Sequence, residues 1–186
     1  MKSNLIIGLK LTLVTLLFFS GIYTLIIFGI AQISPNQGKG IMVESNGKKF
    51  YKNIGQSFTE DKYFNSRPSA VAYNAAGSGG SNKGPSNPEY LAEVQGRIDT
   101  LLIQNPDIKK SEIPVDLVTA SGSGLDPNIS VESAKVQIKR IAKVRNLKEK
   151  QLENLIATTT EKPLLGLFGP EKINVLELNI ALDKLK

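Results

Sequence analysis

Residues 73–90 read YNAAGSGGSNKGPSNPEY, a glycine-rich stretch that is too varied in composition to be a plain flexible linker. Its glycines permit positive φ and close backbone approach, and its asparagines can bond their own backbone and fix tight turns. A second tract with the same chemistry, TASGSGLDP, occupies residues 119–127. We therefore expect two ordered surface loops that support one another on a packed domain, with two unrelated disordered connectors as the alternative.

These two loops are also the candidate interaction surface. Loops held by a rigid scaffold carry recognition more often than the elements they connect. We hypothesise that they form or support a docking surface for a partner protein, with pure internal packing of turns as the alternative. The candidate docking residues are Asn74, Gly79, Gly80, Ser81, Asn82, Ser121, Gly122, Ser123 and Asp126.

The sequence lacks the residues that most catalytic and metal sites need. It contains no cysteine and no histidine, which excludes Ser-His-Asp and Cys-His mechanisms and leaves zinc or copper with carboxylates only. Lys83 is followed by Gly84 and Pro85, whereas a phosphate-binding P-loop needs Ser or Thr after its lysine. Residues 45–48 fit a Ser-x-x-Lys pattern, but their central Asn-Gly is a strong hairpin signal and the companion motifs are missing. We therefore expect no catalysis by this chain alone, no metal site and no tightly bound cofactor.

An uncharged, largely apolar run occupies residues 11–33. At about 1.5 Å per residue, such a helix spans the roughly 30 Å hydrocarbon layer of a bilayer. A cleaved signal peptide is the alternative, because Gly29 and Ala31 are small, but the apolar region of a signal peptide is usually about 7–15 residues long. We predict one retained transmembrane helix.

Lysines lie on both sides of this run. Lys2 and Lys10 precede it and Lys39, Lys48 and Lys49 follow it, so the positive-inside rule by itself does not fix the orientation. The short head suits a signal anchor, which would place the later residues outside the cytoplasm. We therefore expect a cytoplasmic head at 1–10, a transmembrane helix at 11–33, a connector with a hairpin at 34–54 and a soluble extracytoplasmic domain at 55–186.

The chain after the apolar run predicts one α+β domain of ordinary size. Apolar residues on both sides of Asn46-Gly47 predict a hairpin over residues 41–53. The short apolar run at residues 113–118 is expected to be a strand or a buried extended segment.

The first helix of this domain follows the glycine-rich loop. It begins at Pro88, with Ser86 and Glu89 at the spacing of a capping box, and it ends at Asn105-Pro106. Its apolar stripe consists of Leu91, Val94, Ile98, Leu101 and Leu102.

Three further helices are expected towards the C-terminus. The second begins near Asp126-Pro127 or at Ser130 and ends at a turn at Asn146-Leu147, and the last begins at Asn174, with Glu177 at capping-box spacing. The inward residues are Ala134, Ile138, Ile141 and Ala142 in the second helix, Leu152, Leu155 and Ile156 in the third, and Val175, Leu178, Leu182 and Leu185 in the last.

The net charge of +6 is unevenly distributed, because residues 135–150 hold seven basic residues and one acidic residue. Lys135, Lys139 and Lys143 recur every four residues and should share one outer face of the second helix. A solvated face and a contact with anionic lipid headgroups are the two readings of this row. With a membrane anchor in the same chain, we expect no nucleic-acid partner.

Four blocks of this sequence, taken together, resemble a known family. They are FTEDKYFNSRPS at 58–69, YNAAGSGGSNKGPSNP at 73–88, PVDLVTASGSGLDP at 114–127 and NVLELNIAL at 174–182. In this order, and over nearly the whole chain, they resemble the C subunit of the Kdp potassium-transporting P-type ATPase.

The resemblance implies an accessory subunit of a potassium uptake complex in the bacterial plasma membrane. It implies two protein partners, a channel-like subunit that carries potassium and a P-type ATPase subunit that hydrolyses ATP, with lipid around the anchor. It also implies a need for this subunit in assembly, and a proposed role as a catalytic chaperone that raises ATP affinity, in which Gln137 matches the glutamine proposed to contact nucleotide. A membrane-anchored surface enzyme or cell-wall binding module, unrelated to transport, is the alternative.

Overall fold

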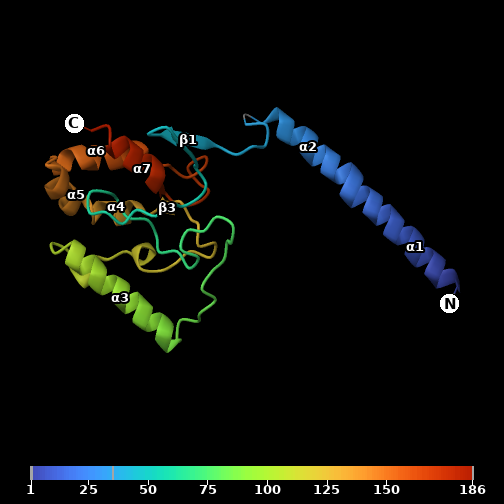
Figure 1. Cartoon of the computed structure of the whole chain (residues 1–186), viewed down its shortest axis with the longest axis horizontal. Coiled ribbons are helices and arrows are strands. Elements are labelled where there is room, and N and C mark those ends of the chain that lie inside the picture. The colour runs from blue at the N-terminus through green and yellow to red at the C-terminus, as the bar shows by residue number, and fades with distance from the viewer. Residues whose placement is uncertain (1, 35, 186) are drawn as a thin grey trace. The chain divides into compact units, whose positions relative to one another are not determined.

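The computed structural model describes residues 2–34 and 36–185, and the chain divides into two compact units, residues 1–41 and residues 42–186. Figure 1 shows the first unit as one long helix and the second as a mixture of helices, short strands and long loops. The expectation of mixed helix and sheet with one N-terminal helix is confirmed.

The first unit is helical from Lys2 to Ile33, in three segments labelled α1 (Lys2–Leu16), η1 (Leu17–Tyr23) and α2 (Thr24–Ile33). The middle segment is a π-helix, and the hydroxyl of Thr24 donates to the carbonyl of Phe19, five residues earlier, at 2.9 Å. Within the helix at residues 3–33, an 18-residue window has a mean hydropathy of 2.3, so the helix is long and apolar enough to cross a membrane.

The second unit opens with the predicted hairpin. Strand β1 (Met42–Ser45) pairs antiparallel with β2 (Lys48–Tyr51), and Ser45 faces Lys48 across the turn. Asn46 and Gly47 have φ of 51° and 74°, the left-handed values that a two-residue turn of this kind needs.

Helix α3 (Pro88–Gln104) begins at Pro88 and ends before Asn105, as predicted. Its cap differs, because the side chain of Asn87, not that of Ser86, accepts the hydrogen bond from the backbone N–H of Tyr90 at 3.0 Å. Proline at the first helical position makes the residue directly before it the cap, so the predicted Ser86 capping box was one residue out of register.

The expected strand or extended segment at residues 113–118 is wrong. Two short 3-10 helices, η2 (Lys110–Glu112) and η3 (Val115–Leu117), occupy this region. Pro114 holds an extended conformation before η3, and Leu117 and Val118 are buried. Tertiary burial therefore explains the apolar run without a strand.

The C-terminal half builds most of the core. Ser130 caps α4 (Val131–Lys135), which a break at Val136 and Gln137 separates from α5 (Ile138–Arg145). Asn146 then adopts a left-handed conformation and ends α5, as the turn prediction required. The remaining helices are α6 (Glu149–Thr159) and α7 (Val175–Leu182).

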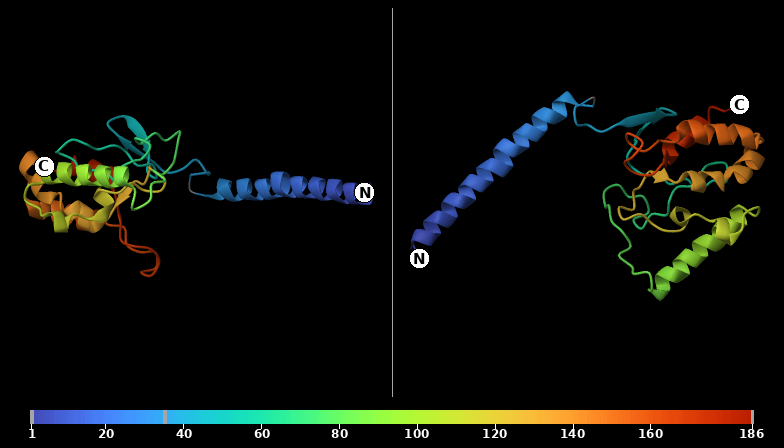
Figure 2. Two further views of the ribbon diagram at one scale, coloured as in Figure 1. Left: turned by 90° about the horizontal axis from the view of Figure 1, so that it is seen from below. Right: turned by 180° about the vertical axis from the view of Figure 1, so that it is seen from behind.

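A second two-stranded sheet joins distant parts of this half. Strand β3 (Asn128–Ile129) pairs antiparallel with β4 (Ile173–Asn174), which leads directly into α7. Residues 160–172, between α6 and β4, form a long loop that projects from the body of this unit (Figure 2). Asn174 caps α7 by accepting from the backbone N–H of Glu177 at 3.1 Å, whereas the Glu177 carboxylate pairs with Lys52.

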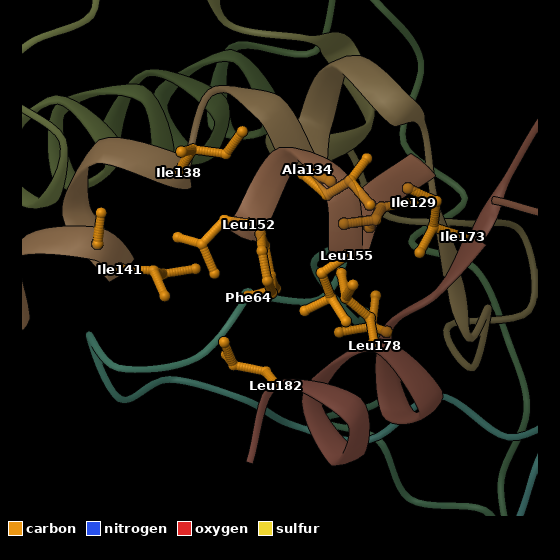
Figure 3. Close-up of a cluster of buried hydrophobic side chains, with 13 residues drawn as sticks. Phe64, Ile129, Ala134, Ile138, Ile141, Leu152, Leu155, Ile173, Leu178 and Leu182 are labelled. Atoms are coloured by element: carbon orange, nitrogen blue, oxygen red, sulfur yellow. The ribbon is translucent and has the colours of Figure 1, made fainter. Parts of the chain in front are cut away.

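Figure 3 shows that the core lies between α4, α5, α6 and α7, with Phe64 inserted among them from an irregular segment. Phe64, Ile141, Leu152, Leu178 and Leu182 are all fully enclosed. The predicted inward faces of these helices are confirmed, except that Leu185 follows the end of α7 and is only partly buried.

Candidate docking surface

The two glycine-rich loops lie against one another. The backbone N–H of Gly79 donates to the carbonyl of Ser123 at 2.9 Å, and the hydroxyl of Ser78 donates to the same carbonyl at 3.0 Å. A Cβ placed on Gly80 would lie 3.1 Å from the carbonyl oxygen of Gly122. The expected mutual support of the two loops is therefore present in the backbone itself. We refer to residues 69–84 and 119–127 together as the loop surface.

Ser69 holds the first loop to the second. Its hydroxyl donates to the carbonyl of Gly124 at 2.6 Å and accepts from the backbone N–H of Tyr73 at 2.8 Å. Gly124 has φ of 67°, and a Cβ there would lie 2.8 Å from the carbonyl oxygen of Gly79 and from a methyl group of Val71. Only glycine fits this point of closest approach.

A partly buried ion pair closes the base of the loop surface. Arg67 Nη1 lies 3.0 Å from Asp126 Oδ2, and the other carboxylate oxygen of Asp126 accepts from the backbone N–H of Asn128 at 3.0 Å. The phenol of Tyr73 donates to the carbonyl of Arg67 at 2.5 Å, and burial raises the pKa of this phenol above its ordinary value. The Arg67 Nε is buried and has no hydrogen-bond partner in the described part of the chain.

The predicted docking residues differ in their exposure to solvent. Asn74, Ser81, Asn82, Gly122 and Ser123 are exposed, whereas Ser121 is buried and can only support the surface from within. The partly buried residues are Gly79, Gly80 and Asp126. A groove of about 530 Å³ lies beside the second loop and is lined by Asn53, Ile54, Arg67, Ser78, Ser121, Gly122, Ser123, Leu125, Asp126 and Pro127.

Three residues that sequence reasoning missed hold the loop surface in place. Arg67 and Ser69 make the contacts described above, and both lie in the familiar block at 58–69. The backbone N–H of Gly55 donates to the carbonyl of Leu125 at 2.8 Å, and a Cβ on Gly55 would lie 2.7 Å from the Asp126 carbonyl oxygen. No local signal in the sequence marks these contacts, because each joins residues far apart in the chain.

Gln137 lies in the interior, at the break between α4 and α5, and is 0% exposed. Its side-chain oxygen accepts from the backbone N–H of Asn65 at 2.8 Å and from Nη2 of Arg140 at 2.6 Å. Its side-chain nitrogen donates to the carbonyl of Ser133 at 2.9 Å. Gln137 therefore binds interior groups and is not part of the exposed loop surface.

Gln137 belongs to a set of polar side chains that bind the backbone of residues 61–65, which form a turn followed by irregular chain. Arg140 Nη2 donates to the carbonyl of Tyr63 at 3.1 Å, and burial lowers the pKa of Arg140 from its ordinary value. The amide of Asn179, on α7, bonds both the N–H and the carbonyl of Phe64 at 2.9 Å. These side chains replace the strand partner that the segment lacks, since buried backbone groups need hydrogen bonds.

The carboxylate of Asp116 lies at the start of α4. Asp116 Oδ2 accepts from the backbone N–H of Ser130 at 2.7 Å, and Asp116 Oδ1 accepts from the hydroxyls of Ser130 at 3.1 Å and Ser133 at 2.6 Å. This position therefore already holds a negative charge. Within residues 2–34 and 36–185, no group of three Asp, Glu, His or Cys side chains is placed to hold a metal ion.

Comparison with known proteins identifies the same family that the four sequence blocks indicated. The family model described as "K+-transporting ATPase, c chain" matches residues 5–184. The chain belongs to the KdpC family. The KdpC subunit of the potassium-transporting ATPase of Flavobacterium johnsoniae is 59% identical over 184 residues, covering 98% of this chain and 99% of that protein.

KdpC subunits of other bacteria are similar at lower identity. The potassium-transporting ATPase KdpC subunit of Bacteroides fragilis is 50% identical over 187 residues, covering 98% of each chain. That of Bacillus cereus is 41% identical over 180 residues, covering 95% of this chain and 93% of its own. Membership of the KdpC family supports an accessory role in a potassium uptake complex. It argues against the alternative of a surface module unrelated to transport.

Proposed function

We propose that this KdpC-family chain is a non-catalytic subunit that assembles with a channel-like potassium-translocating subunit and a P-type ATPase subunit in the bacterial plasma membrane, and that the loop surface is its docking site. The observation that carries the proposal is the construction of that surface. Two exposed polar loops are held together by the backbone hydrogen bond from Gly79 to Ser123 and by the close approach of Gly124 to Gly79, so little conformational entropy is lost when a partner binds.

Two exposed positions test docking without disturbing the loops. The Ser81 side chain is exposed and makes no hydrogen bond in the described part of the chain, and a Cβ on Gly122 has no atom within 4 Å. The double variant Ser81→Arg, Gly122→Arg should fold normally yet lose co-purification with the channel-like and ATPase subunits. Ser111→Arg, at an exposed position on η2, is the matched control and should co-purify. Full assembly of the double variant would show that docking lies elsewhere.

We further propose that residues 42–186 lie outside the cytoplasm, with the N-terminal helix as a single membrane span. The length and apolarity of residues 3–33 support the span, and the orientation is what the following experiment decides. Because the chain has no cysteine, Ser111→Cys gives a single labelling site. A membrane-impermeant thiol reagent should label it in cells whose outer membrane has been permeabilised. Labelling that requires rupture of the plasma membrane would place the domain inside.

Any effect on ATP affinity is, in this proposal, transmitted through the assembled complex and not through a nucleotide held by Gln137. Three observations support it: Gln137 is enclosed, its side-chain oxygen already accepts two hydrogen bonds, and Asp116 occupies the nearby helix start. The complex with Gln137→Glu, which keeps the shape of the side chain, can be compared with wild type for the KM for ATP. A change in KM without any change in assembly or unfolding temperature would favour direct contact.

A further inference from the structure

The loop between α6 and β4 brings four exposed large apolar side chains together within five residues. Leu165 and Leu167 are each 81% exposed, and Leu164 and Phe168 are 69% and 64% exposed. From Pro163 to Pro170 the sequence PLLGLFGP contains no charge. We call residues 163–169 the apolar tip. Such a concentration of exposed apolar surface marks a contact with a membrane or a partner.

Hydrogen bonds hold the apolar tip in one shape. The backbone N–H groups of Leu164 and Phe168 each donate to the other residue's carbonyl at 3.0 Å, and Gly166 N–H donates to the carbonyl of Pro163 at 2.9 Å. Below the tip, the backbones of Glu161 and Lys172 pair in the same way, at 2.8 and 3.1 Å. Figure 2 shows the loop standing clear of the helices, so the tip reaches beyond the body of the unit.

Basic residues lie at the base of this loop. A groove of about 700 Å³ runs from α4 and α5 to the loop, and Lys135, Lys139 and Lys162 are among its lining residues. None of the ion pairs within residues 2–34 and 36–185 involves these three lysines. Three glutamates also line the groove, Glu149, Glu153 and Glu171, and Glu153 pairs with the fourth lining lysine, Lys150. An apolar tip beside lysines that form no ion pair is typical of a segment that enters the headgroup region of a bilayer.

A short connector tethers the second unit to the helix that is proposed to span the bilayer. Only residues 34–41 separate the end of α2 from the start of β1, and eight residues extend at most about 30 Å. A tethered surface meets the bilayer at high effective concentration, which strengthens a contact made by only four apolar side chains. We propose that the apolar tip inserts into the lipid interface and holds residues 42–186 against the membrane that the N-terminal helix crosses. This inference rests on the proposed membrane span but not on the loop surface or its partners.

The test uses the whole chain in lipid nanodiscs containing anionic lipid, with one nitroxide label on a single introduced cysteine. Leu167→Cys places the label on the tip, Ser111→Cys places it on another exposed part of the second unit, and Leu13→Cys places it within the helix. Oxygen, which concentrates in lipid, and a water-soluble nickel chelate compete as relaxing agents. The ratio of oxygen to nickel accessibility should be severalfold higher at Leu167 than at Ser111.

The remaining outcomes separate the possible causes. Equal ratios at Leu167 and Ser111, with a lipid value at Leu13, would overturn the proposal while leaving the span intact. A water-like value at Leu13 would show instead that the proposed span had failed. Protection of Leu167 from both agents, seen only when the channel-like and ATPase subunits are present, would assign the tip to a protein partner and would also overturn lipid insertion.

Discussion

The side-chain oxygen of Gln137 accepts a hydrogen bond of 2.8 Å from the backbone N–H of Asn65, 72 residues earlier in the chain. The same oxygen accepts from Arg140, which also binds the carbonyl of Tyr63. One glutamine thus connects the helix break to the irregular segment that carries Phe64 into the core. This arrangement makes Gln137 important for stability, and it separates that role from the proposed contact with nucleotide.

Replacement of Gln137 by Ala should destabilise the domain by about 2–3 kcal/mol, because it leaves the Asn65 N–H and one Arg140 donor buried without their acceptor. Thermal unfolding of the full chain in detergent, followed by circular dichroism, measures the loss. Lys139→Ala, on the exposed face of α5, is the control and should shift the unfolding temperature little. Equal effects of the two substitutions would contradict the structural role of Gln137.

The full chain without its partner subunits should bind ATP only weakly. The helix start that could hold phosphate is occupied by Asp116, and Gln137 is not accessible to solvent. Isothermal titration of the chain with ATP should therefore show no saturation at micromolar concentrations. Saturable micromolar binding that disappears in Gln137→Ala, while unfolding shows that the variant remains folded, would establish direct nucleotide contact.

Gly124→Val should disturb the loop surface more than Gly122→Val. Valine at 124 would be strained at φ of 67° and would collide with the Gly79 carbonyl, at a cost of about 1–3 kcal/mol for the backbone conformation alone. Gly122 has a free position for a Cβ, so its substitution should be tolerated. Hydrogen exchange of the Gly79 amide, which donates to Ser123, should accelerate only in the Gly124 variant. Unchanged protection in both variants would show that the loops do not depend on this approach.

Stability should change with pH through the cluster around Lys52. Lys52 Nζ lies 2.9 Å from Glu177 Oε2 and 3.1 Å from Glu161 Oε1. The hydrogen bond with Glu177 is the main reason that the pKa of Lys52 is raised above 10.5. Burial by itself would raise the pKa of Glu161, but the hydrogen bond and charge of Lys52 outweigh it and lower that pKa below 4.5.

The pKa shifts of Lys52 and Glu161 set the upper and lower limits of the pH range in which this cluster contributes fully to stability. The Lys52 contribution is complete below pH 10.5 and is lost as the pH rises through the raised pKa of the folded state. The Glu161 contribution is complete above pH 4.5 and is lost as the pH falls through the lowered pKa. Lys52→Met should remove about 1 kcal/mol between these limits, since the partners are partly exposed. Lys184→Met, at an exposed lysine outside every described ion pair, should leave the profile unchanged.

The row of Lys135, Lys139 and Lys143 is exposed, as its spacing predicted. If it faces anionic headgroups, each lysine should contribute about 1 kcal/mol to association. Residues 42–186, once shown by near-UV circular dichroism to be folded, should co-sediment with anionic vesicles, and substitution of the row by Gln should weaken this. A matched triple substitution at Lys49, Lys109 and Lys184 should have a smaller effect. Equal sedimentation of both triples would leave the row as a solvated face.

Local signals predicted much of the fold because their physical causes lie within a few residues. Asn46-Gly47 adopts left-handed backbone more readily than other pairs, Pro88 suits a helix start, and Asn146 accepts the left-handed end of α5. The same reasoning failed at residues 113–118, where apolar composition reflects burial in the tertiary structure. Periodicity cannot distinguish a buried strand from buried 3-10 turns of that length.

The candidate site shows the same limit. The composition of residues 73–90 and 119–127 predicted ordered loops that meet, but Ser69 and Arg67, which hold them, lie outside both tracts. Ser121 is buried and Ser123 is exposed, and two serines of similar local context gave no means of telling them apart.

The sequence by itself determined the apolar helix, the hairpin, several helix ends, most inward faces and the family, because each depends on residue type and short spacing. Only the tertiary structure decided that Gln137 is enclosed, that side chains of α5 and α7 bind segment 61–65, and that the apolar tip is left uncovered. These features depend on which distant segments meet. The physical reason is that a buried polar group takes its partner from whichever part of the chain packs against it, and no short pattern encodes that choice.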